Sequence, residues 1–177
     1  MTMAIETVTV IGLGTMGNGI AQVMAHHGKQ VLAVDLNEAS LRRGVAAIEK
    51  SLGRVAKKGR LEESEIPAIM GRIKTSTSLE DAAGSDLIVE AAAEDYGIKL
   101  NIFGQLDSIA KPDAILASNT SSISITRIGG ATTRADKVIG MHFMNPVPVM
   151  KLVEVIRGLD TSDETTEAVN ALSAELG

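Results

Sequence analysis

His142 is the residue of this sequence best placed for acid–base chemistry. It stands in the segment Gly-Met-His-Phe-Met-Asn-Pro-Val-Pro, directly after a predicted strand over residues 137–141. Ligands of open α/β sheets bind beyond the carboxyl ends of the strands, and histidine is a natural general base near neutral pH once a partner fixes its tautomer. Glu154, on a predicted strand over residues 152–156, could bind the other ring nitrogen. The spacing alone leaves a structural role for His142 equally open.

A second polar group follows another predicted strand, at residues 114–117. It reads Ser118-Asn119-Thr120-Ser121-Ser122, and its hydroxyl and amide groups could orient a substrate oxygen. The alternative is that one of these residues caps the helix that follows. Glu94 and Lys99 flank the end of a predicted strand over residues 87–91. They form either a surface pair or part of a ligand-binding site at the same edge of the sheet.

A glycine-rich turn, Gly12-Leu13-Gly14-Thr15-Met16-Gly17, joins a predicted strand over residues 7–11 to a predicted helix over residues 16–27. The first glycine permits the tight turn, the second lets the backbone approach a pyrophosphate, and the third allows the helix to pack closely on the sheet. The N–H groups and dipole of the helix start then receive the anion. Because the motif stands between a strand and a helix, it predicts a dinucleotide-binding βαβ unit.

Asp35 ends the second predicted strand, over residues 30–34. An acid at this place accepts hydrogen bonds from the ribose 2′-hydroxyl and repels a 2′-phosphate, so NAD is favoured over NADP. The alternative is an aspartate that caps a helix or a turn. Arg42 and Arg43 weaken the argument against NADP, although we expect both to be solvated on the next helix.

Strands alternate with helices along the chain, which predicts one domain with a Rossmann-type, doubly wound and mostly parallel sheet. The further expected elements are a strand at residues 73–76, a helix at residues 98–109 and a last helix that begins after Thr161 or Ser162. Residues 38–71 are an exception, because two amphipathic helices there exceed an ordinary crossover connection. We interpret them as an inserted helical hairpin, around Leu41–Lys58 and Glu62–Met70, that stands off the sheet.

Composition narrows the classes of function. The chain has 177 residues, a net charge of -5, only 2% aromatic residues and no cysteine. The charge and the scarcity of aromatic rings argue against a nucleic-acid surface, and no apolar run approaches the roughly 20 residues of a membrane span. The lack of cysteine excludes disulfides and thiolate metal ligands, and we expect no metal site. A cytoplasmic protein is the default expectation.

Three blocks of sequence carry a resemblance to a known family. They are Gly-Leu-Gly-Thr-Met-Gly-Asn-Gly-Ile-Ala, Ala-Ser-Asn-Thr-Ser-Ser and His-Phe-Met-Asn-Pro-Val-Pro-Val-Met-Lys-Leu-Val-Glu-Val. The chain resembles the L-3-hydroxyacyl-CoA dehydrogenase family, which includes bacterial 3-hydroxybutyryl-CoA dehydrogenases, and the last two blocks are far more specific than the glycine motif. The resemblance implies a β-oxidation enzyme that oxidises the 3-hydroxyl group of an acyl-CoA to a ketone and passes hydride to NAD.

The resemblance also implies roles for three residues in that reaction. His142 matches the family's catalytic base and Glu154 the carboxylate that orients it. Ser121 matches the serine that hydrogen-bonds the substrate oxygen. His142 would remove the hydroxyl proton as hydride leaves C3 for the nicotinamide ring, and Glu154 would stabilise the imidazolium that forms.

Further residues match binding positions of the family. Asn145, Lys99 and Glu94 match residues close to the nicotinamide and the substrate. Within the hairpin, Ser51 and Lys58 match positions that contact the CoA moiety. A basic turn suits the CoA phosphates, although the turn that holds Lys58 could also be an ordinary solvated charge cluster.

The resemblance has one large departure. In the family a helical C-terminal domain follows, which carries a catalytic asparagine, part of the substrate pocket and the dimer interface. The sequence ends at Gly177, before any such motif. We therefore expect the chain alone to be inactive or weakly active, and a homodimer in the full-length context. The alternatives are a short-chain β-hydroxyacid dehydrogenase, which shares the Gly-Leu-Gly-x-Met-Gly turn, and a non-catalytic NAD-binding module.

Overall fold

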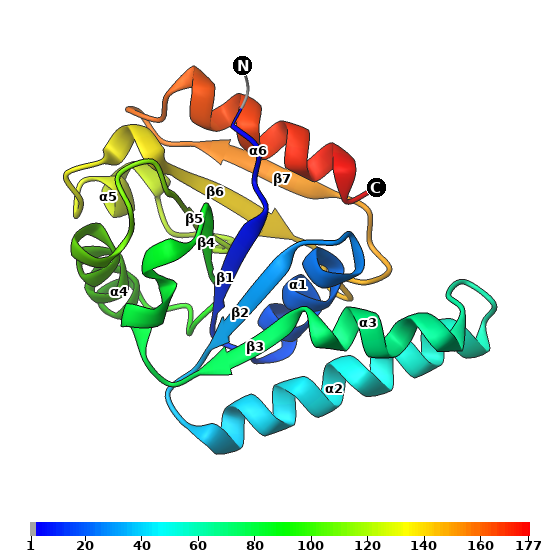
Figure 1. Ribbon diagram of the computed structural model, residues 1–177. Helices are drawn as coiled ribbons and strands as arrows, with labels where there is room; N and C mark the ends of the chain where they lie inside the picture. The colour runs from blue at the N-terminus through cyan, green and yellow to red at the C-terminus, as the bar shows by residue number, and fades with distance from the viewer. Residues whose placement is uncertain (1–2) are drawn as a thin grey trace.

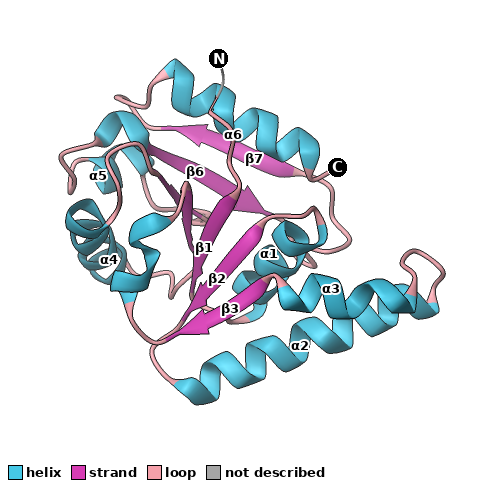
Figure 2. Ribbon diagram, viewed as in Figure 1, coloured by secondary structure: helices cyan, strands magenta, loops and turns pink. Residues whose placement is uncertain are grey.

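A seven-stranded sheet with helices on both faces organises residues 3–177, the part of the chain that the computed structural model describes (Figures 1 and 2). The strand order is β3-β2-β1-β4-β5-β6-β7, and all neighbours are parallel except β6 and β7. This order confirms the Rossmann-type, mostly parallel sheet. The strands are β1 (Thr7–Ile11), β2 (Gln30–Val34), β3 (Ile73–Ser76), β4 (Leu87–Glu90), β5 (Ile115–Ser118), β6 (Val138–Phe143) and β7 (Val153–Arg157).

The helices alternate with the strands largely as predicted. They are α1 (Thr15–His26), α2 (Glu38–Lys57), α3 (Ile66–Gly71), α4 (Tyr96–Ile109), α5 (Ile125–Gly129) and α6 (Asp163–Glu175), with 3-10 turns at Glu63–Glu65, Leu79–Gly84 and Ala135–Lys137. Ser162 is the N-cap of α6, where its side chain accepts a hydrogen bond from the Thr165 N–H. The prediction missed α5, because a helix of 5 residues is too short to show a periodic apolar face.

Apolar side chains pack on both faces of the sheet. On one face, Ile20 of α1, Ile48 of α2 and Val169 of α6 belong to one buried cluster. On the other face, Phe103 of α4 and Ile128 of α5 belong to a second cluster. Every residue of β4 and β5 is buried, as expected of parallel strands covered on both sides. The two layers hold the carboxyl ends of the strands along one edge, where the polar residues of interest lie.

The hairpin of α2 and α3 packs on the domain along part of its length, and its tip projects beyond the sheet (Figure 1). Leu41 and Leu52 of α2 are buried. A Cβ built on Gly44 of α2 would lie 2.5 Å from the Leu13 side chain, so this helix covers the glycine turn directly. The expectation that the hairpin stands off the sheet is therefore wrong for the body of α2 and applies only to the tip.

β6 is longer than predicted, and this changes the setting of His142. The strand ends at Phe143, so His142 lies within it rather than after it. It continues because the antiparallel strand β7 pairs with it to its end, with Glu154 directly opposite His142 in the register. An antiparallel last pair cannot be recognised from alternating strands and helices, which is why the predicted strand ended two residues early, at Met141.

Within residues 3–177, none of the helices combines the length and the apolar character that crossing a bilayer requires. The same part of the chain holds no group of three or more His, Asp or Glu side chains placed to bind a metal ion.

Asp86 ties the start of β1 to the start of β4, at the edge of the sheet opposite the polar cluster. Its carboxylate accepts hydrogen bonds from the backbone N–H groups of Glu6 and Thr7, both at 2.9 Å, and from the Lys111 ammonium at 2.5 Å. Burial alone would raise the pKa of Asp86, but these donors lower it from 3.8 to about 2.

The depressed pKa of Asp86 predicts an acid-sensitive contribution to stability. Because the folded-state pKa lies below that of the unfolded chain, the contribution is complete above the unfolded pKa of 3.8 and is lost as the pH falls toward 2. Asp86→Asn should lower the free energy of unfolding by about 2 kcal/mol at neutral pH and by much less near pH 2, as measured by urea unfolding. The control is Asp113→Asn, at an exposed aspartate. An equal loss at both pH values would contradict the assignment.

Candidate active site

The glycine turn between β1 and α1 leaves open space only where a ligand would need it. Gly12 has a φ of +86°, and a Cβ there would lie 2.7 Å from the Ala91 carbonyl oxygen. A Cβ on Gly17 would lie 1.7 Å from the Gly12 carbonyl oxygen, so the close contact of helix and turn excludes any side chain. A Cβ on Gly14 would meet nothing within 4 Å. The turn therefore fits a pyrophosphate that approaches the backbone at Gly14.

Asp35 is held at the end of β2 by the same turn. One carboxylate oxygen accepts a hydrogen bond from the Leu13 N–H at 2.7 Å, and the other accepts one from the Leu36 N–H at 2.7 Å. The helix-cap alternative for Asp35 is wrong, because Asn37 caps α2 and accepts a hydrogen bond from the Ser40 N–H at 2.9 Å. Carboxylate oxygens have further acceptor sites, so Asp35 can still bind a ribose hydroxyl.

The cavities beside Asp35 suit an adenosine. A mostly apolar one of about 340 Å³ includes Gly12, Asp35 and Leu36 in its wall. A neighbouring cavity of about 250 Å³ includes Asp35 again, together with Arg43, whose guanidinium donates to the Ser40 hydroxyl at 3.0 Å. Arg43 is exposed as expected, but it faces the cofactor side of the turn. The preference for NAD over NADP at this site therefore stays a prediction that rests on Asp35.

His142 and Glu154 form a cross-strand pair. The Nδ1 atom of His142 lies 2.8 Å from a carboxylate oxygen of Glu154. The His142 side chain is 22% exposed and that of Glu154 is 52% exposed, so the ring stands at the surface of a cavity while its partner reaches solvent. Because a carboxylate accepts hydrogen bonds, the contact places the proton of the neutral ring on Nδ1, which donates to Glu154, and leaves Nε2 as the nitrogen that can accept a proton from a ligand.

One cavity of about 340 Å³ at the carboxyl edge of the sheet brings together residues singled out far apart in the sequence. The predicted residues in its wall are Met16, Glu94, Lys99, Ser121, His142 and Asn145. They come from the start of α1, the segments that follow β4, β5 and β6, and the strand β6 itself. The glycine turn is continuous with this wall through Met16, so a dinucleotide bound at the turn can extend into the cavity.

Glu94 organises the turn after β5. Its Oε1 atom accepts hydrogen bonds from the Thr120 hydroxyl, from the Ser121 N–H at 3.3 Å and from the Ser122 hydroxyl at 3.2 Å. Burial alone would raise the pKa of Glu94, but the Thr120 hydrogen bond and the positive charge of Lys99 lower it. Glu94 thus remains a carboxylate that fixes the backbone at Ser121.

The run from Ser118 to Ser122 does not cap the next helix, so that part of the prediction is wrong. Ser124 is the cap of α5, through a hydrogen bond from the Arg127 N–H. The Thr120 hydroxyl instead accepts hydrogen bonds from the N–H groups of Ser122 and Ile123 and stabilises a turn. The turn leaves Ser121 exposed in the wall of the cavity.

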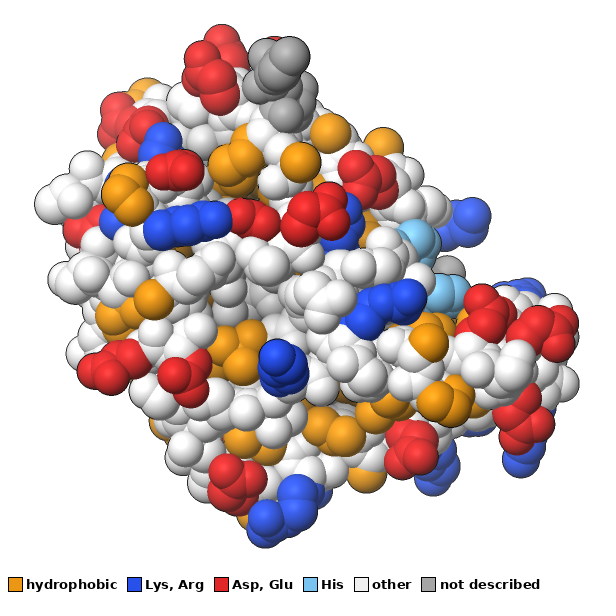
Figure 3. Space-filling view, in the orientation of Figure 1, with side chains coloured by type: hydrophobic (Ala, Val, Ile, Leu, Met, Phe, Trp, Pro, Cys, Tyr) orange, Lys and Arg blue, Asp and Glu red, His pale blue; other side chains and the backbone are white. Residues whose placement is uncertain are grey.

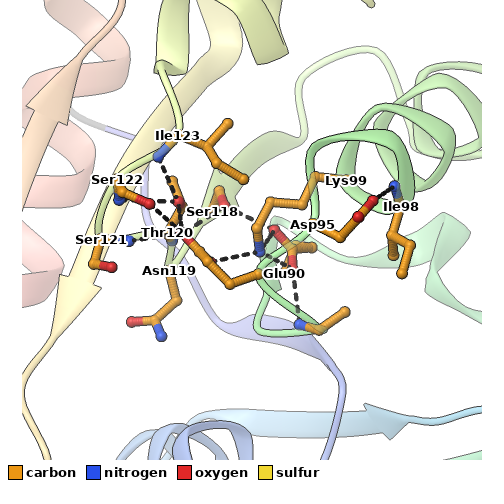
Figure 4. Close-up of polar contacts among 12 residues, drawn as sticks. Glu90, Asp95, Ile98, Lys99, Ser118, Asn119, Thr120, Ser121, Ser122 and Ile123 are labelled. Atoms are coloured by element: carbon orange, nitrogen blue, oxygen red, sulfur yellow. Dashed lines mark hydrogen bonds and ion pairs between the residues drawn. The ribbon is translucent and has the colours of Figure 1, made fainter.

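The structure adds one residue that the sequence analysis missed, Glu90 at the end of β4. Its side chain is fully buried and accepts two hydrogen bonds from the Lys99 ammonium, at 2.7 and 2.9 Å (Figure 4). Lys99 is only 1% exposed, so its interpretation as half of a surface pair is wrong. The available signal was an acid at the end of the otherwise apolar run Leu-Ile-Val-Glu, since a buried carboxylate needs a partner.

Ser51 and Lys58 lie away from this cavity, on the hairpin. Ser51 is part of α2, and Lys58 is its C-cap at the projecting tip. Neither residue is in the wall that contains His142. On the face shown in Figure 3, the projecting end carries both basic and acidic side chains rather than a purely basic surface. Their predicted contact with CoA remains a prediction.

Comparisons with known proteins point in one direction. Residues 7–177 match the family model described as 3-hydroxyacyl-CoA dehydrogenase, NAD binding domain. A probable 3-hydroxybutyryl-CoA dehydrogenase of Bacillus subtilis is 49% identical over 175 residues, which cover 99% of this chain and 61% of that protein. The human mitochondrial hydroxyacyl-coenzyme A dehydrogenase is 46% identical over 179 residues, which cover 98% of this chain and 57% of that protein.

A solved structure shows the same arrangement. The crystal structure of an (S)-3-hydroxybutyryl-CoA dehydrogenase from Ralstonia eutropha matches with a TM-score of 0.96 at 52% identity, and the match covers 98% of this chain and 62% of that one. The chain therefore spans about three fifths of the length of the relatives it matches.

Proposed function

The chain belongs to the 3-hydroxyacyl-CoA dehydrogenase family, as the NAD-binding domain, and we propose that it provides the cofactor site and the proton acceptor for oxidation of a 3-hydroxyacyl-CoA to a 3-ketoacyl-CoA. The family match confirms NAD as the cofactor. The observation that carries the proposal is the cavity in which Ser121 and His142 meet beside the glycine turn, with Glu154 paired to the histidine.

The chemistry follows from the pair of His142 and Glu154. Nε2 of His142 accepts the proton of the 3-hydroxyl group, which forms the imidazolium while the C3–O bond becomes a carbonyl. NAD⁺, which the glycine turn and Asp35 would hold, would supply the acceptor for the hydride at C3. The carboxylate of Glu154, 2.8 Å from Nδ1, stabilises the imidazolium and holds the ring in place. General-base assistance of this kind contributes about 10²–10⁴ in rate.

The other residues of the cavity orient the reacting groups. Ser121 is exposed in the wall, which supports the role we assign to its hydroxyl, a hydrogen bond to the substrate oxygen. Glu94 keeps this segment fixed through its contact with the Ser121 N–H. Asn145 lies in the wall beyond the end of β6, and we assign it contacts with both the nicotinamide and the substrate. When both reactants are held in fixed positions, much of the entropy that a bimolecular encounter would lose is already lost on binding, before the chemical step.

The CoA part of the substrate is assigned to the hairpin. Ser51 and Lys58 are proposed to contact it, because an ammonium at the tip can pair with CoA phosphates. For the whole protein we propose a homodimer that is located in the cytoplasm. We also propose that the whole protein makes further contacts with the substrate. The family match argues against a β-hydroxyacid dehydrogenase that acts on free acids. A non-catalytic NAD-binding module would bind NAD but transfer no hydride.

The choice of substrate class gives a direct test. The whole protein in excess over substrate, saturated with NAD⁺, should form NADH from 3-hydroxybutyryl-CoA and at most a trace from free 3-hydroxybutyrate, because only the thioester has a CoA group for the hairpin. NADH absorbance after mixing measures both. Equal NADH formation from the free acid would contradict the proposed substrate class, and NADH binding without formation from either would favour the non-catalytic module.

A further inference from the structure

An ion pair buried beneath the cavity takes no part in the proton transfer. Glu90 ends β4 and Lys99 lies on α4, and their side chains are 0% and 1% exposed. The Glu90 carboxylate also accepts hydrogen bonds from the Ser118 hydroxyl and the Ala92 N–H, both at 2.7 Å. Removing two charges from water costs desolvation free energy that their attraction often does not recover. A buried ion pair is therefore weak evidence for a purely stabilising role.

The two members of the ion pair differ in their position relative to the cavity. Lys99 is in the wall of the cavity and Glu90 is not. The Lys99 ammonium contacts two carboxylates: an oxygen of Glu90 lies 2.7 Å from it (Figure 4), and an oxygen of Glu94 lies 3.4 Å from it. Lys99 can balance only one of the two carboxylates, so the three groups together carry one net negative charge, and the carboxylate in the wall of the cavity is Glu94. Without Glu90, the ammonium would cancel Glu94 instead.

The two forms of the cofactor differ in charge at the end that enters this cavity. The nicotinamide ring of NAD⁺ carries a positive charge, and the ring of NADH carries none. We propose that Glu90 is a positioning residue that acts through Lys99 to set the relative affinity of the site for the oxidised and reduced cofactor. With Glu90 in place, Glu94 is left to attract the oxidised ring. This inference rests on the proposed function, since that function places the nicotinamide beside Glu94.

The variants Glu90→Gln and Lys99→Met test the proposal, because they should shift the ratio of the NAD⁺ and NADH dissociation constants in opposite directions. The first removes a negative charge without changing shape, so the dissociation constant of NAD⁺ should rise relative to that of NADH by about five-fold. The second removes a positive charge, so the same ratio should fall. In the double variant the two changes offset each other, and the ratio should return close to that of the wild type. Calorimetric titration with NAD⁺ and NADH at low ionic strength measures each ratio.

The controls separate charge from packing. Ser118→Ala removes a neutral hydrogen bond to Glu90 and should leave the ratio of the two dissociation constants unchanged. Thermal unfolding with and without NADH shows which variants are folded. If Glu90→Gln does not fold, Lys99→Met carries the test, because the Ser118 hydroxyl and the Ala92 N–H still donate to Glu90 there.

The outcomes distinguish this inference from the proposed function. If the two dissociation constants change in parallel in each folded single variant, so that their ratio stays constant, Glu90 has only a structural role and the inference is overturned. If the wild-type chain binds neither form of the cofactor, the proposed function fails as well. Opposite shifts of the ratio in the two single variants support the inference, since a loss of packing has no preference for a charged ring.

Discussion

In the whole protein, His142→Gln should lower the rate of hydride transfer from 3-hydroxybutyryl-CoA to NAD⁺ by about 10²–10⁴ and leave NADH binding nearly unchanged. Glutamine keeps a polar side chain but cannot accept a proton at neutral pH, so the hydroxyl group loses its base. The Nδ1 contact with Glu154 shows that the histidine is oriented by the neighbouring strand and not by the cofactor turn. Single-turnover kinetics with protein in excess measures the rate, and a fluorescence titration measures NADH binding.

A second histidine provides the matched control. His27 caps the far end of α1, where its Nδ1 lies 2.9 Å from the Val23 carbonyl oxygen. His27→Gln should change the rate of hydride transfer by less than about two-fold, because this residue lies outside the cavity that holds Ser121. If His142→Gln abolished NADH binding while the rate with bound cofactor stayed normal, His142 would be a structural residue and the mechanism would be wrong.

Gly17→Ala should weaken NADH binding by about 100-fold while the chain remains folded. The added methyl group would stand 1.7 Å from the Gly12 carbonyl oxygen, which is backbone and cannot rotate away as a flexible side chain does. The turn must then separate from α1, and the N–H groups that face the pyrophosphate lose their positions. A fluorescence titration with NADH measures the affinity, and circular dichroism confirms the fold.

Gly53→Ala is the control for this change, at a helical glycine whose Cβ would meet nothing within 4 Å. Alanine in the interior of α2 should raise the stability by up to about 1 kcal/mol and leave the NADH affinity unchanged. A similar affinity for NADH in wild type and Gly17→Ala would show that the turn does not hold the pyrophosphate.

The sequence predicts the roles of residues that belong to short contiguous motifs. The glycine turn and the acid at the end of β2 follow from short-range rules, because a strand, a tight turn and a helix start are contiguous in sequence. His142 was recognised because ligands bind beyond the ends of parallel strands. Its pairing with Glu154 needed the register of β6 and β7, which only the structure shows.

The missed features depend on contacts between distant segments. Glu90 and Lys99 are 9 residues apart, and Ser118, which completes their network, is 28 residues from Glu90. No periodic pattern links such positions. Likewise, packing of α2 on the glycine turn depends on Gly44 meeting Leu13, a contact that amphipathic periodicity does not reveal. Sequence patterns indicate which face of an element is apolar, and the fold decides what covers it.

In the proposed reaction, hydride would leave C3 of a hydroxyacyl-CoA held beside His142 and reach the cofactor bound at the glycine turn. The whole protein in excess can be mixed with unlabelled NAD⁺ and 3-hydroxybutyryl-CoA that carries deuterium at C3, and the NADH is then examined by mass spectrometry. The NADH formed should carry the deuterium. NADH without deuterium, or no NADH although both ligands bind, would contradict it.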